Sequence, residues 1–247
     1  MKRSSFSKKR IIHIYAIIFV VIIILLFACA LMFKYHVEGE KNLPFNLKKI
    51  NIISTAESAL NKDEEVWHAK ILQKNDIFFV IEKNSNYKKD ETIKSVSFEN
   101  FQVEKLNEDM IISIYRPTTS VDKYTYSEEY KIENSLEYQG GMSTNAEVLQ
   151  INNQGGLIGF SVTSDNIGEY VFKENEILPS DGRLLAKANV NSENIKFEIS
   201  FDIIIETNEN HRFKTNMKIE LPTGNILEEG VGTLEDADLE NVIFKRF

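Results

Sequence analysis

The chain carries two hydrophobic patterns, one uniform and one alternating. Residues 11–33 contain no Asp, Glu, Lys or Arg, and their centre, residues 17–27, is apolar at every position. At about 1.5 Å per residue a helix of this length covers roughly 34 Å, which exceeds a hydrocarbon core of about 30 Å. A soluble helix this uniform would need burial on all sides. The pattern predicts one transmembrane α-helix over residues 11–33.

The charges that flank this segment predict its orientation. Residues 1–10 carry five basic and no acidic side chains, whereas Glu38 and Glu40 soon follow Lys34 on the other side. Basic residues collect on the cytoplasmic side of membrane helices. We therefore expect a cytoplasmic N-terminus at the cell membrane, and an extracytoplasmic location for the rest of the chain.

The segment around Cys29 leaves two further interpretations open. Ala28-Cys29-Ala30 resembles a cleavage site of small residues, and Cys29 could also carry a lipid. However, the preceding apolar run of about 17 residues is longer than a usual signal peptide, and the chain stays apolar to Phe33. We expect an uncleaved signal-anchor, in which Cys29 is a small apolar residue of the helix.

The chain after residue 45 shows the two-residue period of β-strands. Odd positions from 195 to 205 are apolar, and polar side chains fill most positions between them. The same pattern returns over residues 213–221. Shorter apolar runs at 77–81 and 111–115 predict buried strands, the second ended by Pro117.

Three local features refine this pattern. Apolar positions change parity between Phe98 and Phe101, which predicts a bulge near residues 99–100. Residues 152–156, Asn-Asn-Gln-Gly-Gly, predict a hairpin loop between two strands. Helical periodicity is weak and confined to residues 55–61.

About a dozen candidate strands follow one another with turns between them. Antiparallel strands with one solvent-facing side predict a mainly β fold, an antiparallel β-sandwich. One jelly-roll-like sandwich and two small sandwiches both fit, with a break near residues 139–141 or 179–182 in the second case. The expected parts are a cytoplasmic basic tail (1–10), the transmembrane helix (11–33), a tether (34–45) and an extracytoplasmic β-sandwich domain (46–247).

Charges predict the register of a hairpin formed by residues 195–206 and 210–221. Because both apolar sets are odd-numbered, paired residue numbers must sum to an even value. A sum of 418 places Glu206 opposite Arg212. A sum of 416 gives three opposite-charge pairs, each contributing roughly 0.2–1 kcal/mol, and a loop at residues 207–209. These pairs are Asp202 with Lys214, Glu198 with Lys218 and Lys196 with Glu220. We expect the sum of 416, which would neutralise this face and make it a poor surface for a charged partner.

The part of the chain after residue 33 is acidic and free of cysteine. It holds all 37 acidic and 24 of the 29 basic side chains, a net charge of −13. Nucleic acids need basic surfaces and are therefore disfavoured as partners. Without disulfides the domain must be held by its hydrophobic core. The lack of an Asn-X-Ser/Thr sequon favours a bacterial cell.

The sequence offers few residues for catalysis. A cysteine nucleophile is excluded outside the membrane, because Cys29 lies in the apolar segment. A Ser-His-Asp triad needs a histidine, and His68 is the one candidate, since His36 lies in the tether and His211 beside a turn. Trp67-His68 is more typical of an amphipathic strand pair than of a catalytic site. We expect a protein that is not an enzyme and assign no catalytic residue.

Metal and ligand sites are also weakly indicated. No two histidines have zinc-ligand spacing, and an acidic run near the C-terminus matches no calcium loop, so we expect no metal and no cofactor. Its members are Glu228, Glu229, Glu235, Asp236, Asp238 and Glu240. Tyrosines at 124, 126, 130 and 138 could stack on sugars or contact protein, but half-buried strands produce the same pattern.

The basic tail, apolar helix and β-rich exterior resemble the layout of uncharacterised single-pass membrane proteins of Gram-positive bacteria. The tether segment 38–45, Glu-Gly-Glu-Lys-Asn-Leu-Pro-Phe, is similar to that group. The resemblance implies a β-rich extracytoplasmic domain at the cell membrane, and it supplies no functional residue.

Three functions remain open. The expected one is a protein-interaction or scaffold module of the cell envelope, or an accessory subunit of a membrane complex, which an apolar patch or uncovered edge strand would favour. The second is a glycan or small-ligand binding module, which an open tyrosine-lined groove would favour. The third is a hydrolase, which a deep pocket holding His68 and carboxylates would favour. The expected partners are membrane lipid around the helix and a protein of the envelope.

Overall fold

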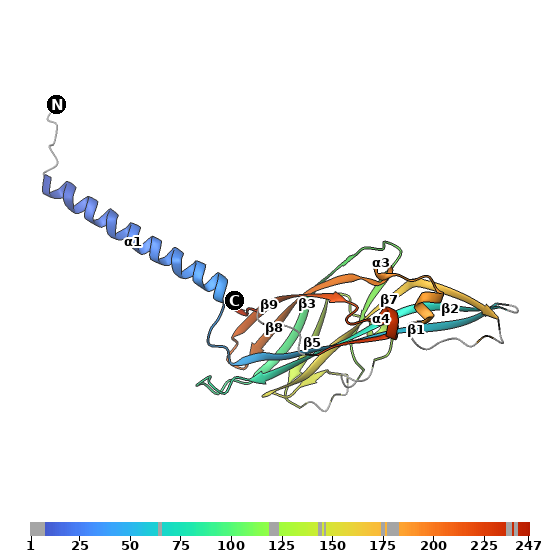
Figure 1. Cartoon of the computed structure of the whole chain (residues 1–247). Helices are drawn as coiled ribbons and strands as arrows, with labels where there is room; N and C mark the ends of the chain where they lie inside the picture. Colours follow the sequence, from blue (N-terminus) through green and yellow to red (C-terminus); the bar gives the residue numbers. More distant parts are fainter. Residues whose placement is uncertain are drawn as a thin grey trace. The chain divides into compact units, whose positions relative to one another are not determined.

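A computed structural model describes residues 8–63, 66–118, 124–142, 145, 147–173, 176, 183–235, 239 and 242–247 (Figure 1). The chain divides into two compact units, Met1–Lys41 and Asn42–Phe247. The first contains the helix α1, and the second, named the β unit below, contains all the strands.

Helix α1 (Lys8–Glu38) includes the whole apolar segment 11–33 and continues through the first residues of the expected tether. Gly39 follows the helix with a φ of 66°, and its N–H donates to the Tyr35 carbonyl at 2.8 Å. A left-handed glycine directly after the last turn is a common helix end. Within the described residues this helix is long and apolar enough to cross a membrane, and its apolar residues are exposed. The chain is thus compatible with a single-pass membrane protein.

The β unit contains two sheets, which confirms the predicted mainly β fold. Sheet A has the order β10-β1-β2-β7-β4, and sheet B has the order β11-β9-β8-β3-β5-β6. Neighbours pair antiparallel except β5 and β6, which pair parallel. The strands of sheet A are β10 (Val231–Leu234), β1 (Phe45–Asp63), β2 (Val66–Lys83), β7 (Gly155–Lys173) and β4 (Ile111–Tyr115). Those of sheet B are β11 (Lys245–Arg246), β9 (Arg212–Leu221), β8 (Phe197–Thr207), β3 (Ile93–Lys105), β5 (Ser135–Gly140) and β6 (Gln150–Ile151).

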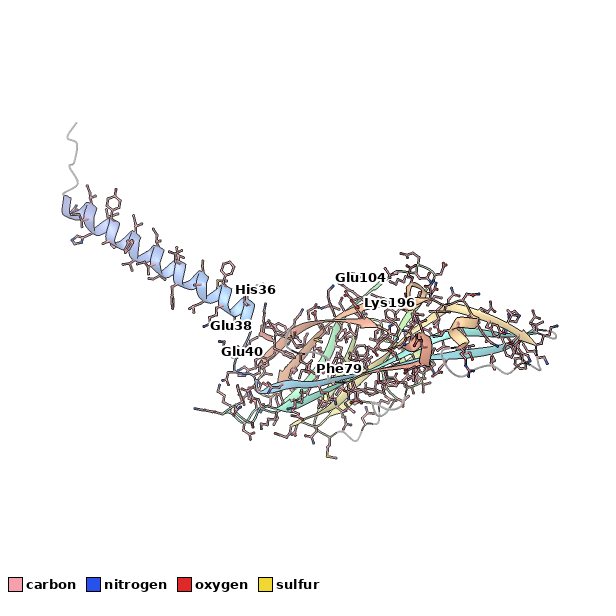
Figure 2. All side chains as sticks on the ribbon, viewed as in Figure 1. His36, Glu38, Glu40, Phe79, Glu104 and Lys196 are labelled. Atoms are coloured by element: carbon pink, nitrogen blue, oxygen red, sulfur yellow. The ribbon has the colours of Figure 1, made fainter. Side chains whose placement is uncertain are left out.

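Both sheets contribute to one core of aromatic and aliphatic side chains. Phe79 and Phe160 come from sheet A, and Phe98 and Phe201 from sheet B; all four are fully buried. Their ring centroids lie 4.9 to 5.9 Å apart, in the range at which aromatic pairs attract each other. Figure 2 labels Phe79 among the strands. A single core spanning both sheets is that of one sandwich.

Strands β1, β2 and β7 form a long ribbon at one end of the β unit (Figure 1). Their ladders continue as far as Asp63 opposite Val66 and Val66 opposite Lys173. Residues 55–61 are therefore part of β1, and the weak helical pattern there was misleading. Most side chains from residue 57 to 63 are exposed. Because neither face of this segment is buried, its apolar and polar residues need not alternate.

Short helices and a turn complete the unit. The helices α2 (Arg183–Lys187) and α3 (Ser192–Ile195) bury Leu184, Leu185 and Ile195. A single turn, η1 (Glu128–Tyr130), follows β4, and α4 (Ile226–Glu229) precedes β10. Asn191 caps α3 by accepting from the N–H groups of the first turn.

Two of the local predictions have different outcomes. The bulge is confirmed, because the β3–β8 register shifts between Glu99 and Gln102 and Asn100 has a φ of 56°. Residues 152–156 do turn, with the Gly155 N–H donating to the Asn152 carbonyl at 2.9 Å. The predicted hairpin is nevertheless wrong, since β6 and β7 belong to different sheets and the turn joins the two layers.

The predicted register of the β8–β9 hairpin is also wrong. Asp202 lies opposite Asn216 and Glu206 opposite Arg212, so paired numbers sum to 418. The opposite charges still meet, because Lys214 reaches diagonally to Asp202 at 2.7 Å. Lys218 reaches Glu198 at 2.8 Å in the same way. Diagonal reach of long side chains removes the electrostatic preference for the sum of 416.

The turn at residues 207–211 decides the register instead. Asn210 has a φ of 57°, and its N–H donates to the Thr207 carbonyl at 2.9 Å. The Thr207 N–H in turn donates to the His211 carbonyl at 2.9 Å. A turn followed by one left-handed residue is a common three-residue hairpin connection, and it leaves no freedom to shift the pairing.

Candidate functional site

The true register assembles a row of three glutamates on the outer face of sheet B. Glu198 lies directly opposite Glu104 of β3 and directly opposite Glu220 of β9. Like charges at directly opposite positions of neighbouring strands destabilise a sheet. We expected the charges on the outer face of the β8–β9 hairpin to cancel. They do not cancel at the end of the hairpin where β8 begins and β9 ends.

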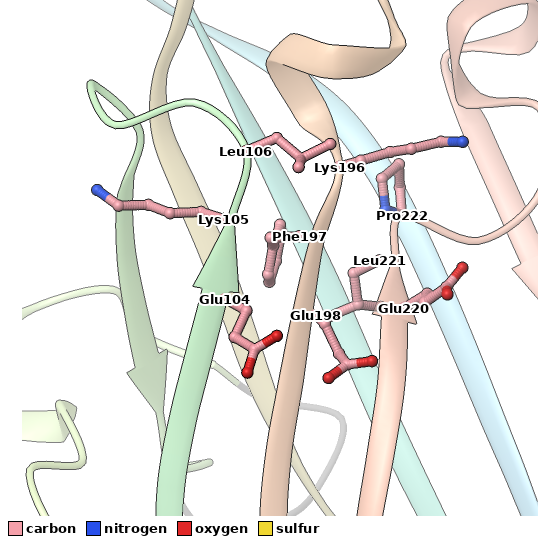
Figure 3. A pocket seen from close by; sticks show the side chains of 9 residues that line it. All are labelled: Glu104, Lys105, Leu106, Lys196, Phe197, Glu198, Glu220, Leu221 and Pro222. Carbon is pink, nitrogen blue, oxygen red and sulfur yellow. The ribbon is translucent and has the colours of Figure 1, made fainter.

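The three glutamates border a pocket of about 530 Å³, which we name the glutamate pocket (Figure 3). Its size is within the range of small-ligand sites. Phe197 and Leu221 are buried beside it, whereas Leu106 is 71% exposed at its rim. The lining residues are Glu104, Lys105, Leu106, Lys196, Phe197, Glu198, Glu220, Leu221 and Pro222. Figure 2 shows Glu104 and Lys196 in the same region of the β unit.

Few cations neutralise this row. Lys218 pairs with Glu198 at 2.8 Å, and the pKa of its ammonium is raised, first by the hydrogen bond to Glu198. Among the residues that the structure describes, the Glu220 side chain has no ion pair or hydrogen bond, and the Glu104 side chain has only an electrostatic interaction with Lys218. Lys105 instead donates to two backbone carbonyls, those of Glu108 at 2.6 Å and Met110 at 2.8 Å.

The lysine side chains at the pocket point away from the glutamate carboxylates. In Figure 3 the carboxylates of Glu104 and Glu198 point to the same side, and the ammonium groups of Lys105 and Lys196 point away in opposite directions. The pocket thus combines carboxylate acceptors with an apolar floor. Such a surface suits a lysine or arginine side chain, whose apolar stem and charged head would contact Leu106 and the carboxylates respectively.

In the described part of the chain, the rings of His68 and His211 each contact a carboxylate. His68 Nδ1 lies 2.8 Å from a carboxylate oxygen of Glu169, on the outer face of sheet A. His211 Nδ1 lies 3.0 Å from the buried Glu91. The Thr207 hydroxyl donates to Glu91 at 2.8 Å and not to the His211 ring. Neither His68 nor His211 lines the glutamate pocket.

Among the described tyrosines, Tyr126 and Tyr138 contact other groups of the β unit. Tyr138 is buried in the core, where its hydroxyl donates to the Gly159 carbonyl. Tyr126 is 37% exposed, with its ring edge-on to Tyr115 at 5.3 Å and Lys74 Nζ 4.4 Å from the ring centroid. Burial raises the pKa of Tyr126 to about 12. Both tyrosines thus make their contacts with other residues of the β unit.

Acidic clusters elsewhere give no metal centre in the described part of the chain. No group of three ligating side chains there could hold an ion. Glu228 and Glu229 lie in α4, where Glu228 accepts a hydrogen bond from Asn225 at 2.7 Å. Asp236, Asp238 and Glu240, like the proposed domain break at 179–182, lie outside the described residues.

One edge of the ribbon lacks a strand partner among the described residues. β10 pairs with β1 only from Ile52 to Thr55, and one further bond joins the Ala56 N–H to the Gly230 carbonyl at 2.9 Å. Beyond this point β1 continues to Asp63, with Leu60 53% exposed. An uncovered edge of this kind can accept a strand from another protein.

The glutamate row was missed because its members are distant in sequence and belong to a common residue type. The one signal available was the register of β8 and β9, which sets Glu198 against either Lys218 or Glu220. Comparison of the chain with protein-family models, with curated proteins and with solved structures gives no match.

Proposed function

We propose that the protein is a single-pass membrane protein of the bacterial cell envelope whose β unit lies outside the cytoplasm and binds a protein partner. It acts without catalysis, as an interaction or scaffold module or as the accessory subunit of a membrane complex. The partner presents a basic segment to the glutamate pocket.

The apolar helix α1 supports the membrane anchor, because its 31 residues exceed the roughly 20 that span a bilayer. Five basic residues before the apolar segment support the cytoplasmic position of the tail. A tagged C-terminus should be digested by protease added to intact, wall-stripped cells. Its protection in such cells would contradict the orientation and leave the binding proposal standing.

The glutamate pocket is the observation that carries the binding proposal. Glu220 has no side-chain partner within the described residues, and Glu104 has the electrostatic attraction of Lys218 alone. Asp202 and Glu206 of the same face are instead paired with lysines. A cationic partner segment would relieve the repulsion along the row, and the uncovered edge of β1 offers a second contact surface for a protein.

The test uses the full-length protein in nanodiscs and a fluorescent peptide of alternating arginine and leucine. The double variant Glu104→Gln/Glu220→Gln should bind this peptide about tenfold more weakly, since two ion pairs at solvent-accessible positions, each contributing up to about 1 kcal/mol, are lost. A matched control, Glu137→Gln/Glu209→Gln, removes the same charge from exposed positions elsewhere and should change binding less than about twofold. Equal effects of the two variants would refute the pocket as the binding site.

A further inference from the structure

Basic side chains gather at the end of the β unit where β1 begins, which we name the proximal end. Ladders between β1 and β2, β3 and β8, and β9 and β11 hold five segments together there. A hydrogen bond from the Ile93 N–H to the Asn153 carbonyl, 2.9 Å, joins the two layers. These segments are residues 43–49, 82–94, 152–156, 206–214 and 245–247.

The proximal end has the opposite charge to the rest of the β unit. It carries ten basic and five acidic side chains, a net charge of +5, although residues 34–247 together carry −13. Its acidic groups are largely neutralised internally, as Asp90 is by Lys83 at 2.7 Å. Lys88 and Lys89, in the same loop, are exposed and have no ion pair among the described residues. Further pairs are Glu206 with Lys94 at 2.6 Å and with Arg212 at 3.8 Å, Glu82 with Lys48 at 3.9 Å, and Glu91 with His211 at 3.0 Å.

An exposed aromatic ring lies within this basic surface. Phe247 is 58% exposed, and the guanidinium of Arg212 lies 4.5 Å from its ring centroid. Cations attract anionic headgroups, and an apolar ring beside them can enter the boundary between headgroups and acyl chains. The combination fits a lipid surface better than a purely polar anionic polymer.

Covalent connection brings the proximal end near a bilayer. Residues 39–44 separate the end of α1 from Phe45, and an extended chain covers at most about 3.6 Å per residue. Phe45 therefore lies within about 25 Å of Glu38.

We propose that the proximal end binds the anionic headgroups of the bilayer that α1 crosses; this inference rests on the proposed membrane anchor. The overall acidity predicts repulsion from such a surface, but charges farther away than the Debye length of about 10 Å are screened. Lys88, Lys89 and their basic neighbours then determine the interaction. The glutamate pocket, about 30 Å along β8 from Thr207, would face away from the lipid.

The test measures hydrogen exchange of the full chain in nanodiscs of phosphatidylcholine alone or with about one-third phosphatidylglycerol. Amides of residues 84–92 should exchange about fivefold more slowly with the anionic lipid, and about 0.5 M salt should abolish the difference. Lys88→Gln/Lys89→Gln should lose this protection. The control Lys70→Gln/Lys173→Gln, which removes equal charge from the ribbon, should keep it.

Each outcome has a distinct meaning. Equal exchange in both lipids, with the chain inserted, would overturn the inference and leave the anchor intact. Failure of the chain to insert would instead refute the anchor. Protection by soluble polyphosphate in neutral nanodiscs, without protection by anionic lipid, would assign the surface to an anionic polymer and overturn the lipid proposal.

Discussion

Two carboxylates of the β unit, the buried Glu91 and the half-buried Asp76, differ in their hydrogen-bond donors. Burial opposes ionisation of Glu91, but donors from Tyr87, Thr207 and His211 outweigh it and lower its pKa below the usual 4.5. Burial dominates at Asp76 and raises its pKa above 3.8, despite the hydrogen bond from Ser161. The number of donors around a carboxylate thus decides whether its charge stabilises the fold.

Replacement of Glu91 by Gln should destabilise the β unit at neutral pH by about 1.5–3 kcal/mol, because hydrogen bonds to the charged group are lost. A lowered folded pKa gives stability that is present above the usual 4.5 and lost as pH falls through the folded value. Urea unfolding followed by Trp67 fluorescence should therefore show a large difference in unfolding free energy between Glu91→Gln and the unaltered protein at neutral pH. This difference should become smaller below about pH 4. The exposed Glu209→Gln is the control, and a difference independent of pH would contradict the charge argument.

Replacement of Asp76 by Asn should change the stability of the β unit in the opposite direction and stabilise it at neutral pH. The raised folded pKa means that ionised Asp76 reduces stability at neutral pH, and that this penalty disappears below the usual 3.8. Among the described residues its Oδ1 is buried without a hydrogen-bond partner. Asp76→Asn should therefore raise the urea midpoint at neutral pH and leave it unchanged under acid conditions. A lower midpoint at neutral pH would mean that hydrogen bonds to ionised Asp76 outweigh the cost of its burial, contrary to the raised pKa.

Strands are the elements that the sequence predicts best, because burial on one face imposes a period of two. Odd-numbered residues of β8 are buried as expected, and the change of parity at Glu99 revealed a real bulge. The exposed ribbon at residues 57–63 lacks that constraint, so its composition was misleading. Alternation restricts the β8–β9 register to even sums, and the left-handed residue Asn210 in the turn then selects 418 over 416.

The turn at Asn210 can be tested directly. Its φ of 57° is accessible to glycine and asparagine, whereas a β-branched residue there should lose about 1–2 kcal/mol. Asn210→Gly should leave the urea midpoint nearly unchanged, and Asn210→Val should lower it clearly. Glu209→Val, at the neighbouring position without positive φ, should have little effect. Equal losses at residues 209 and 210 would mean that the left-handed conformation does not fix this turn.

At the scale of the whole molecule, the sequence predicts the division into an apolar helix and a β-rich unit, but not the position of the candidate site. Glu104, Glu198 and Glu220 come from three strands and meet only through two correct registers. The same applies to the basic proximal end, which unites five segments. The net charge of residues 34–247 is a sum and contains no information on position. The strands place the three glutamates at one end of sheet B and the basic side chains at the proximal end.

One core shared by two sheets predicts one cooperative unfolding transition for the β unit. Phe98 contacts Phe79 and Phe160 of the opposite sheet with ring centroids 4.9 and 5.2 Å away. Phe98→Ala should therefore destabilise both sheets together by about 3–5 kcal/mol. Trp67 fluorescence, which reports on the ribbon of sheet A, and circular dichroism, which reports on all strands, should shift by the same amount in the full-length protein in detergent. A chelator or dithiothreitol should leave the transition unchanged, because the chain has a single cysteine and its described part has no group of side chains that could hold a metal ion. Two separate transitions, with Trp67 insensitive to Phe98→Ala, would show that the sheets fold independently and that the shared core is not what holds the unit together.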